Sequence, residues 1–313
     1  MVPNTRAFGD RSGLGEPINV LSNEDLAVRY ERPSTLKEAT TLLAKEKGSA
    51  YVLAGGTDLL VRLRTGFIEP DLVVDIKNIA STRVVQSAAG GFKIGSAVTC
   101  AELGEHGALK KAWPGVVEAA NLIGSKQVQG RCTVTGNLCN ASPAADSVPA
   151  LVAAGAKANI VGPKGKRSIP VEQVPAGPGR TSLKKGEIIE SIGLPKRAPR
   201  SGDAYLRFIP RTEMDIAVVG VGISLTLDAK GVCTAARVAL GAVAPTVLLV
   251  PEAAKALIGT KLDKAALDNL AAACSAACRP IDDKRGTRDF RIKVAGVLAR
   301  RAAQIARKRA GGK

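Results

Sequence analysis

Two glycine-bearing loops, about eighty residues apart, contain residue types that could bind a phosphate group. The first, Ala54–Leu60, has the sequence AGGTDLL and directly follows the apolar run Tyr51–Leu53. The second, Thr133–Leu138, has the sequence TVTGNL and continues to Asp146. Each loop places backbone N–H groups and a small hydroxyl where an anion could lie against the main chain. Two such loops predict a clamp for a diphosphate.

The first loop differs from the common nucleotide-binding fingerprints. It has no GxGxxG pattern, and it lacks the lysine that a P-loop requires. Gly55 and Gly56 nevertheless let the backbone approach a ligand and adopt positive φ. Thr57 and Asp58 then begin a predicted helix, whose N-terminus favours negative charge. A Gly-Gly turn before a helix also has a purely structural use, so this loop alone does not decide the function.

The second loop adds side chains that can form hydrogen bonds with a nucleotide. Thr133 and Thr135 supply hydroxyls, and Gly136 allows close approach. Asn137 offers both a donor and an acceptor. Asp146 cannot bind phosphate, but its carboxylate could accept hydrogen bonds from sugar hydroxyls. The combination fits a dinucleotide cofactor with a ribose or ribityl chain.

The composition excludes other kinds of site. His106 is the only histidine, so a His-rich zinc site is excluded, and a Ser-His-Asp or Cys-His site would have to use this residue. We expect His106 at the exposed end of a short helix that begins with the capping-box pattern Thr99–Glu102. No apolar run approaches about 18 residues, so we predict no membrane span. We also expect no signal peptide at the N-terminus.

The cysteines indicate reduced thiols and a cytoplasmic location. There are six, spread through the chain: Cys100, Cys132, Cys139, Cys233, Cys274 and Cys278. Cys274 and Cys278 are four residues apart, a spacing that two metal ligands on one helix could have. However, they share a helix face with Leu267 and Leu270, which favours a role in packing the hydrophobic core. No CxxC occurs, and the spacing of an iron–sulfur cluster is lacking. We therefore predict no metal in this chain.

The chain is strongly basic, with a formal net charge of +17. Residues 279–313 contain twelve Lys and Arg against three Asp. Aromatic residues make up only 3% of the chain, which argues against a base-stacking surface for nucleic acid. The basic residues are expected on the solvated face of an amphipathic helix, where they could meet an acidic protein partner. The apolar face of that helix would consist of Phe290, Val294, Val297, Leu298 and Ile305.

The first part of the chain is predicted to be α/β. A helix should begin at Ser34 or Thr35 and end at Gly48. Residues 51–54 and 72–76 have the composition of buried strands, with a helix over residues 57–64 between them. Strand, helix and strand in this order form a βαβ unit.

Antiparallel patterns follow. Gly90-Gly91 separates residues 83–87 from residues 92–97, which indicates a hairpin. Residues 156–195 are typical of short antiparallel strands, and the proline-containing stretch 194–202 is the best domain boundary. The fold class is therefore α+β. Further helices are expected over residues 109–122, 252–257, 265–278 (capped by Asp263) and 288–309, and further strands over residues 217–227 and 235–243.

The two glycine loops and the further stretches given below resemble the FAD-binding, medium subunit of the molybdenum hydroxylases, the xanthine dehydrogenase and carbon monoxide dehydrogenase family. The resemblance implies an N-terminal extension over residues 1–25 and a PCMH-type FAD-binding domain over residues 26–199. It implies the family's C-terminal α+β domain over residues 200–309. The most specific matches are Ala54–Leu60, Gln127–Asp146, Glu187–Pro195, Tyr205–Gly222 and Asp283–Arg300.

The resemblance also implies which residues bind FAD. Asp146 would contact the cofactor through sugar hydroxyls, and Ile188 or Ile189 would be the apolar residue near it. Arg207 stands where relatives often carry a lysine, a cation that would stabilise the anionic reduced flavin. Thr135 replaces a glycine of the usual second loop. The diphosphate would be held by the two loops and their flanks, namely Leu53, Ala54, Gly55, Gly56, Thr57, Asp58, Cys132, Thr133, Val134, Thr135, Gly136 and Asn137.

The implied function is electron relay. A large subunit with a molybdenum cofactor would oxidise the substrate, and a small subunit with [2Fe–2S] clusters would pass electrons to FAD in this chain. An external acceptor, which the sequence does not identify, would then take them. Two alternatives stay open: a stand-alone FAD-dependent oxidoreductase of the same superfamily, and a basic interaction protein that keeps a flavin fold without redox work.

Overall fold

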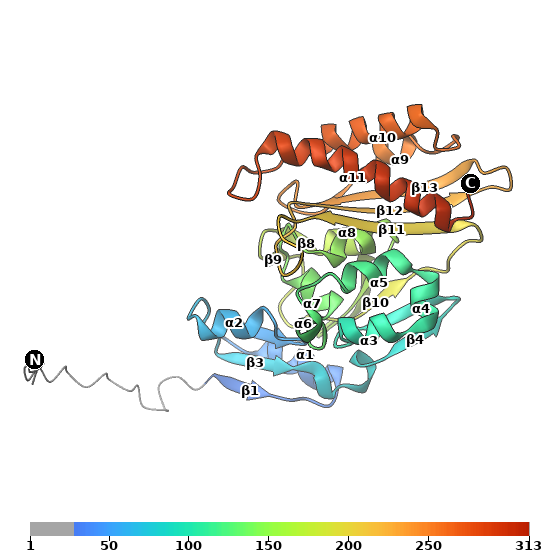
Figure 1. The fold of residues 1–313 in the computed structure, drawn as a ribbon. Coiled ribbons are helices and arrows are strands. Elements are labelled where there is room, and N and C mark those ends of the chain that lie inside the picture. The colour runs from blue at the N-terminus through green and yellow to red at the C-terminus, as the bar shows by residue number, and fades with distance from the viewer. Residues whose placement is uncertain (1–27, 313) are drawn as a thin grey trace, which may run out of the picture.

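The computed structural model describes residues 28–312, in which three main β-sheets each contribute to a separate hydrophobic cluster. In Figure 1 the N-terminal sheet lies at the bottom, and the C-terminal sheet lies near the top beneath α10 and α11. The architecture is α+β, as predicted. The expected N-terminal extension, residues 1–25, lies outside the described residues.

The N-terminal sheet is parallel, in the order β1-β3-β2. Helices connect its strands, as parallel pairing requires, which confirms the predicted βαβ unit. The first glycine loop directly follows β2. The elements are β1 (Arg29–Glu31), α1 (Leu36–Lys45), β2 (Ala50–Leu53), α2 (Leu59–Arg64) and β3 (Leu72–Asp75).

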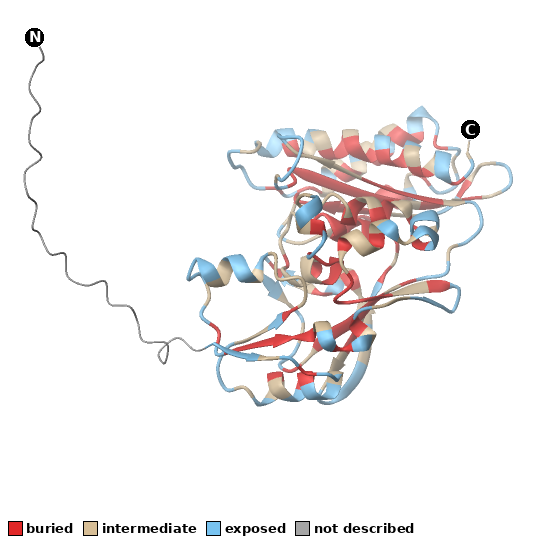
Figure 2. Cartoon of the chain, turned by 60° about the horizontal axis from the view of Figure 1, so that its bottom comes forward, coloured by how far each residue is buried: buried red, intermediate tan, exposed pale blue. Residues whose placement is uncertain are grey.

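The two helices of this unit are held differently. The Thr35 hydroxyl caps α1 by accepting a hydrogen bond from the Glu38 N–H (3.2 Å), and α1 buries Ala39 and Leu43 against the sheet. In contrast, α2 buries none of its residues. Figure 2 shows this helix at the periphery in the colours of exposed and intermediate residues. The hydrophobic core therefore does little to hold α2 in place.

The second sheet is antiparallel, in the order β4-β5-β10-β6-β7. The predicted hairpin is confirmed as β4 (Val85–Ala88) and β5 (Gly91–Gly95). The central strand, β10 (Ile188–Leu194), comes from the end of this part of the chain and pairs with β5 and β6. Strands β6 (Lys157–Gly162) and β7 (Gly165–Pro170) complete the sheet. The short elements around it are η1 (Ile76–Asn78), η2 (Ala80–Thr82), η3 (Val171–Gln173), β8 (Pro175–Gly177) and β9 (Arg180–Thr181).

Short helices cover this sheet, and one prediction about them is wrong. The single helix expected over residues 109–122 is two helices that meet at Trp113, whose backbone leaves the helical region (φ −132°, ψ 63°). Pro114 begins the second helix, because proline has no N–H to continue the first one and is favoured at the first helical position. The helices are α3 (Cys100–Glu105), α4 (Gly107–Ala112), α5 (Pro114–Ala120), α6 (Lys126–Gln129), α7 (Val134–Cys139) and α8 (Ser147–Ala153).

His106 has a structural role in this region. The capping box expected at Thr99 is present at the start of α3. His106 ends α3 and begins α4, and its Nδ1 accepts a hydrogen bond from the Leu109 N–H (3.1 Å). Its ring also contacts Phe92 edge to face, with centroids 6.0 Å apart. Helix capping and packing account for this histidine.

The C-terminal part is a four-stranded antiparallel sheet between two layers of helices (Figure 1). On one side lie α10 and α11, and on the other lies α8 of the preceding part, which packs against β12 and β13. The sequence analysis missed β11. The elements are β11 (Ser201–Phe208), β12 (Val219–Leu227), β13 (Cys233–Gly241), β14 (Leu248–Leu249), α9 (Pro251–Lys255), α10 (Lys264–Ala277) and α11 (Arg288–Arg309).

The apolar face predicted for the last helix is confirmed in part. Leu298 is buried, and Val294 and Ile305 pack against the same cluster, but Phe290 is 40% exposed. The helix instead buries mostly small residues, because it crosses β11 closely: an ideal Cβ placed on Gly202 would lie 1.9 Å from the Ala306 carbonyl oxygen. Such an approach leaves no room for larger side chains. The residues of α11 that are buried are Arg291, Ala295, Gly296, Leu298, Ala299, Ala302, Ala303 and Ala306.

Polar contacts join the C-terminal sheet to the helices of the preceding part. Asp203 on β11 accepts hydrogen bonds from Arg197 (2.6 Å) and from the Gly115 N–H at the start of α5 (2.9 Å). Arg309 donates to the Asp203 carbonyl oxygen (2.8 Å) and pairs with Glu118 on α5. These bonds fix the two parts relative to each other beside the shared helix α8.

Residues 28–312 contain no helix that is both long and apolar enough to cross a membrane. Within the same range, no group of three or more His, Cys, Asp or Glu side chains could hold a metal ion. The pair Cys274 and Cys278 is buried in the C-terminal hydrophobic cluster, as the helical spacing predicted.

We predict that Gly202→Ala destabilises the protein. The added methyl group would meet the backbone of α11, which cannot move without disturbing the alanine-lined face. Overpacking of this kind costs about 1–3 kcal/mol. Denaturant unfolding should show this loss for Gly202→Ala and none for Gly107→Ala, whose Cβ would meet nothing within 4 Å. Equal stability of the two variants would show that α11 does not constrain β11.

Candidate functional site

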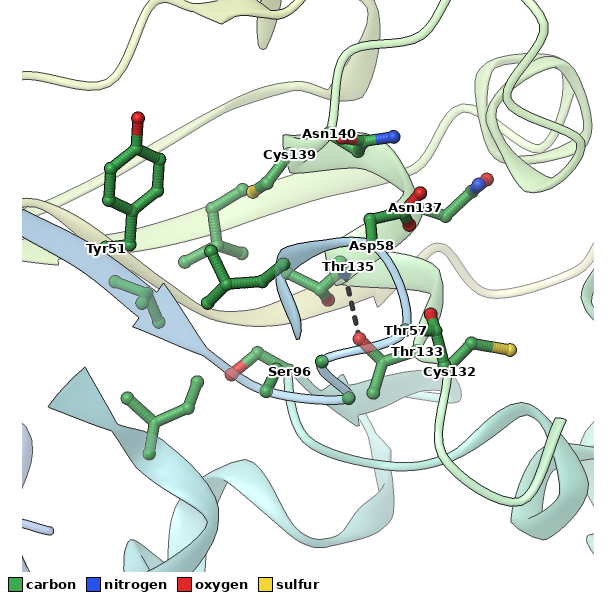
Figure 3. A pocket seen from close by; sticks show the side chains of 18 of the residues that line it. Tyr51, Thr57, Asp58, Ser96, Cys132, Thr133, Thr135, Asn137, Cys139 and Asn140 are labelled. Atoms are coloured by element: carbon green, nitrogen blue, oxygen red, sulfur yellow. Dashed lines mark hydrogen bonds between the residues drawn. The ribbon is translucent and has the colours of Figure 1, made fainter. Parts of the chain in front are cut away.

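A cavity of about 340 Å³ lies between the two glycine loops. This volume is within the range of small-molecule sites. Figure 3 shows side chains from β2, from the first loop and from the start of α7 converging on it. The cavity is lined by Ala50, Tyr51, Val52, Ala54, Gly55, Gly56, Thr57, Asp58, Leu59, Arg62, Ile76, Ser96, Ile123, Cys132, Thr133, Thr135, Gly136, Asn137, Cys139, Asn140, Gly179, Thr181, Leu183, Glu187, Ile188 and Ile189.

The two loops touch each other at Gly55. An ideal Cβ at this position would lie 2.2 Å from the Arg131 carbonyl oxygen and 2.9 Å from the Cys132 Cα. Any side chain would therefore push the loops apart. Gly56 has φ +85°, a conformation that favours glycine, and turns the chain into α2. The first glycine thus permits loop contact, and the second permits the turn.

The second loop is built by the cap of α7. The Thr133 hydroxyl accepts a hydrogen bond from the Gly136 N–H (2.8 Å), drawn as the dashed line in Figure 3. At Gly136 an ideal Cβ would meet only that hydroxyl, at 3.0 Å, and Gly136 lines the cavity. The side-chain amide oxygen of Asn137 (Oδ1) accepts hydrogen bonds from the Ser147 N–H (3.1 Å) and from the Ser147 hydroxyl (2.7 Å). Ser147 thus fixes the side chain of Asn137 at the cavity wall.

Unpaired polar atoms concentrate in this cavity. Across residues 28–312, five buried side-chain nitrogen or oxygen atoms have no hydrogen-bond partner. Three of them belong to residues of the cavity lining, namely the Thr135 Oγ1, the Ser96 Oγ and the Arg62 Nε. Buried polar atoms are nearly always paired, so such a cluster calls for an explanation. Phosphate and hydroxyl groups are the kind of partner that these atoms lack, and this donor set fits a flavin nucleotide.

The charged side chains of the lining are Asp58, Arg62 and Glu187. Burial raises the pKa of Asp58, and the charge of Arg62 opposes that rise. Glu187 is already paired, with two hydrogen bonds from Arg167 (2.8 and 2.7 Å), and these bonds lower its pKa. Desolvation raises the pKa of the Cys139 thiol to about 12, so this thiol stays protonated at neutral pH. The lining therefore offers no reactive thiolate at Cys139.

The cavity brings together most of the residues predicted for the site. Those that line it are Ala54, Gly55, Gly56, Thr57, Asp58, Cys132, Thr133, Thr135, Gly136, Asn137 and Ile189. Leu53 and Val134 are both buried, Val134 within the cluster of the second sheet, and neither lines the cavity. Asp146 and Arg207 also lie outside the lining.

Asp146 and Arg207 form a buried ion pair between α8 and β11. The Arg207 guanidinium donates to one Asp146 oxygen (2.7 Å), and the Tyr205 hydroxyl donates to the other (3.1 Å). Burial raises the pKa of Asp146 to about 6, although both partners act in the opposite direction. Both carboxylate oxygens therefore already have donors from the C-terminal part. The adjacent residue, Ser147, is the one that fixes Asn137.

Sequence reasoning missed several lining residues. Arg62 follows Asp58 by four positions on the predicted helix, so helical spacing could have indicated that the two share a face. Ser96 and the segment 179–183 reach the cavity through sheet pairing that no local pattern reveals. Tyr51 and Val52 were predicted to lie in a strand, but the sequence analysis did not infer that this strand forms a wall of the cavity.

Two family models match the chain. The model described as "FAD binding domain in molybdopterin dehydrogenase" matches residues 26–197. The model described as "CO dehydrogenase flavoprotein C-terminal domain" matches residues 204–306. Together they cover nearly all the described residues, and the first alone covers more than half of the chain.

Individual relatives agree with these models. The chain is 32% identical to the carbon monoxide dehydrogenase medium chain of Afipia carboxidovorans, over 90% of this chain and 97% of the relative. It is 31% identical to the xanthine dehydrogenase FAD-binding subunit of Escherichia coli O157:H7, over 91% and 97%.

Solved structures show the same fold. Reconstituted CO dehydrogenase from Oligotropha carboxidovorans contains a chain that matches with a TM-score of 0.86 and 32% identity, over 90% of this chain and 98% of that one. Quinoline 2-oxidoreductase from Pseudomonas putida 86 matches with a TM-score of 0.83 and 26% identity, over 91% and 98%. The resemblance, the fold class and the FAD cofactor inferred from the sequence are confirmed. The chain belongs to the FAD-binding, medium-chain flavoprotein family of the molybdopterin dehydrogenases.

Proposed function

We propose that this chain is the FAD-carrying electron-transfer subunit of a molybdenum-containing hydroxylase or dehydrogenase. It receives electrons from [2Fe–2S] clusters of a partner subunit and passes them to an external acceptor. The observation that carries this proposal is the cavity between the two loops, in which three unpaired polar atoms await a ligand. The relatives named above, among them a medium chain and a FAD-binding subunit, support the same assignment.

The residues of the two loops hold the cofactor in this proposal. Backbone N–H groups of residues 54–58 and of Val134 and Thr135 at the start of α7 bind the diphosphate, since glycine lets the main chain approach an anion closely. The Gly136 N–H is used by the cap of α7. The Thr135 and Ser96 hydroxyls donate hydrogen bonds to it or to the adjoining sugar, which removes two of the unpaired atoms. Leu53 and Val134 support the loops from the hydrophobic core.

When bound, FAD supplies the redox chemistry, because it can exchange electrons singly or in pairs. The chain itself orients the cofactor and limits its exposure. Ile188 and Ile189 on β10 form an apolar wall that excludes water from part of the cavity. The Arg207–Asp146 pair holds a guanidinium near the junction of the two parts, where it can favour negative charge on a reduced flavin. None of these steps requires an acid–base residue.

The partners follow from the same proposal. A large molybdenum-cofactor subunit and a small [2Fe–2S] subunit complete a heterotrimer, and "medium chain" in the name of the Afipia carboxidovorans relative fits such an arrangement. The FAD-binding domain spans residues 26–199 and the C-terminal domain residues 200–309. We propose a cytoplasmic location, which is supported by six cysteines that are all free.

The first prediction concerns cofactor content. The purified chain should carry one FAD that acid precipitation releases completely, and Gly136→Val should yield a folded protein with little FAD. A valine there would project into the cavity, and losing several hydrogen bonds to a charged group, each worth about 1.5–3 kcal/mol, lowers affinity by orders of magnitude. Gly107→Val, at an open position outside the cavity, is the matched control.

Flavin absorbance relative to protein concentration measures the outcome. If Gly136→Val binds as much FAD as the wild type, the second loop is not part of the FAD site. FMN in the supernatant, or colour that remains with the pellet, would contradict the proposal of one non-covalent FAD. A colourless wild-type protein that also fails to bind added FAD would favour the basic interaction protein that keeps the fold without redox work.

The second prediction concerns electron relay. The isolated chain, reduced chemically, should pass electrons to an artificial acceptor but should not turn over purines, aromatic acids, aldehydes or carbon monoxide. Turnover should require the molybdenum and iron–sulfur subunits, because this chain lacks an acid–base site in its cavity. Bleaching of the flavin by a substrate in the isolated chain would refute the relay and favour a stand-alone oxidoreductase.

A further inference from the structure

One cation faces the cavity. Arg62 lies on α2 and is the only lysine or arginine of the cavity lining within residues 28–312. Its Nε is buried without a hydrogen-bond partner. It takes part in none of the ion pairs found across these residues. A guanidinium that is partly buried and unpaired at a cavity wall points to an anionic group that would pair with it.

The position of Arg62 is set by two aromatic rings. Its guanidinium carbon lies 5.8 Å from the centre of the Tyr51 ring and 5.3 Å from the centre of the Phe67 ring. Both distances are in the cation–π range. Tyr51 belongs to β2 and Phe67 to the segment after α2. The two rings therefore hold the guanidinium beside the first loop from two different segments of the chain. This arrangement pre-orients the side chain before a ligand binds.

The charge balance of the cavity favours such a group. A diphosphate brings two negative charges, and the lining adds the carboxyl groups of Asp58 and Glu187. Glu187 is paired with Arg167, whereas Arg62 is the cation whose charge acts on Asp58. Burying an anion without a counter-charge is costly. The first loop also lacks the lysine with which a P-loop meets its phosphates. Arg62 is the side chain placed to supply that missing charge.

We propose that Arg62 is the counter-ion of the FAD diphosphate and sets the preference of this site for a phosphorylated ligand. This inference rests on the proposed FAD site and adds a residue to it. The guanidinium, held by Tyr51 and Phe67, donates hydrogen bonds to phosphate oxygens, while the loop N–H groups bind the same phosphates from the other side. Arg62 is a positioning and specificity residue, and it takes no part in electron transfer itself.

The test measures FAD affinity in the full-length protein after the flavin has been removed. Arg62→Gln should weaken FAD binding by about tenfold to a hundredfold, the range expected when a hydrogen-bonded charge pair is lost. The salt dependence of binding should become shallower, because one ionic contact has gone. Arg62→Lys should restore part of the affinity, since it keeps the charge without the planar fork. Fluorescence quenching of FAD reports each constant.

Two control variants separate a local contact from other effects. Arg64→Gln removes one exposed charge of the same helix, α2, outside this cavity, and it should bind FAD like the wild type. Phe67→Leu removes a ring beside Arg62 and keeps the charge, so it should weaken binding less than Arg62→Gln. If Arg64→Gln or Phe67→Leu matches the loss of Arg62→Gln, the effect comes from net charge or from support of α2, and the proposal fails.

Competition with ADP and adenosine identifies the group that Arg62 recognises. Arg62→Gln should weaken competition by ADP and leave adenosine unchanged. An equal loss for both ligands would mean that Arg62 contacts the base, which overturns the proposal, as would unchanged FAD affinity. Failure of the wild-type apoprotein to bind FAD would instead refute the proposed function, so the two failures are distinguishable.

Discussion

The contact between Gly55 and the backbone of Arg131 is the constraint on which the site depends. The first loop ends a strand of a parallel sheet, and the second begins a helix more than seventy residues later. Their main chains meet with no room for a single added carbon. Because backbone touches backbone, the residues of both loops are held together around one cavity. A ligand clamp made from two loops needs such a fixed point.

The C-terminal part depends on a similar use of small residues. The sheet β11–β14 lies between α8 on one face and α10 and α11 on the other. The buried residues of α8 belong to the cluster of the preceding part, which also includes Tyr205 and Ala239 of the C-terminal sheet. Gly222 lies against the Pro149 carbonyl of α8, where an ideal Cβ would be 2.4 Å away. Since α8 also carries Ser147, which fixes Asn137, packing of the C-terminal sheet bears directly on the second loop.

Local patterns predicted the elements whose causes are local. The last helix was assigned over residues 288–309, and it runs over Arg288–Arg309 with Thr287 as its cap. The βαβ unit and the hairpin were found because apolar runs and glycine pairs mark them. The break at Trp113 was missed because Pro114 suits both the interior kink of one helix and the start of another. The buried alanines of α11 were missed because alanine carries little hydrophobic signal, although close packing prefers it.

The same distinction applies to the residues of the site. Residues next to a glycine pair or a helix cap could be predicted, since one short stretch of sequence shows both what they can bind and where they lie. Asp146 and Arg207 are 61 residues apart, and only the docking of β11 beside α8 makes them an ion pair. Thr135 is the most informative departure from the family pattern. A glycine at this position would offer only its backbone to the cavity. Thr135 adds a hydroxyl, which is buried and unpaired in a residue of the cavity wall. An unpaired buried hydroxyl weakens the empty site, so binding a polar ligand gains the bond that folding left unmade. The loops are therefore stabilised by what they bind as well as by how they pack.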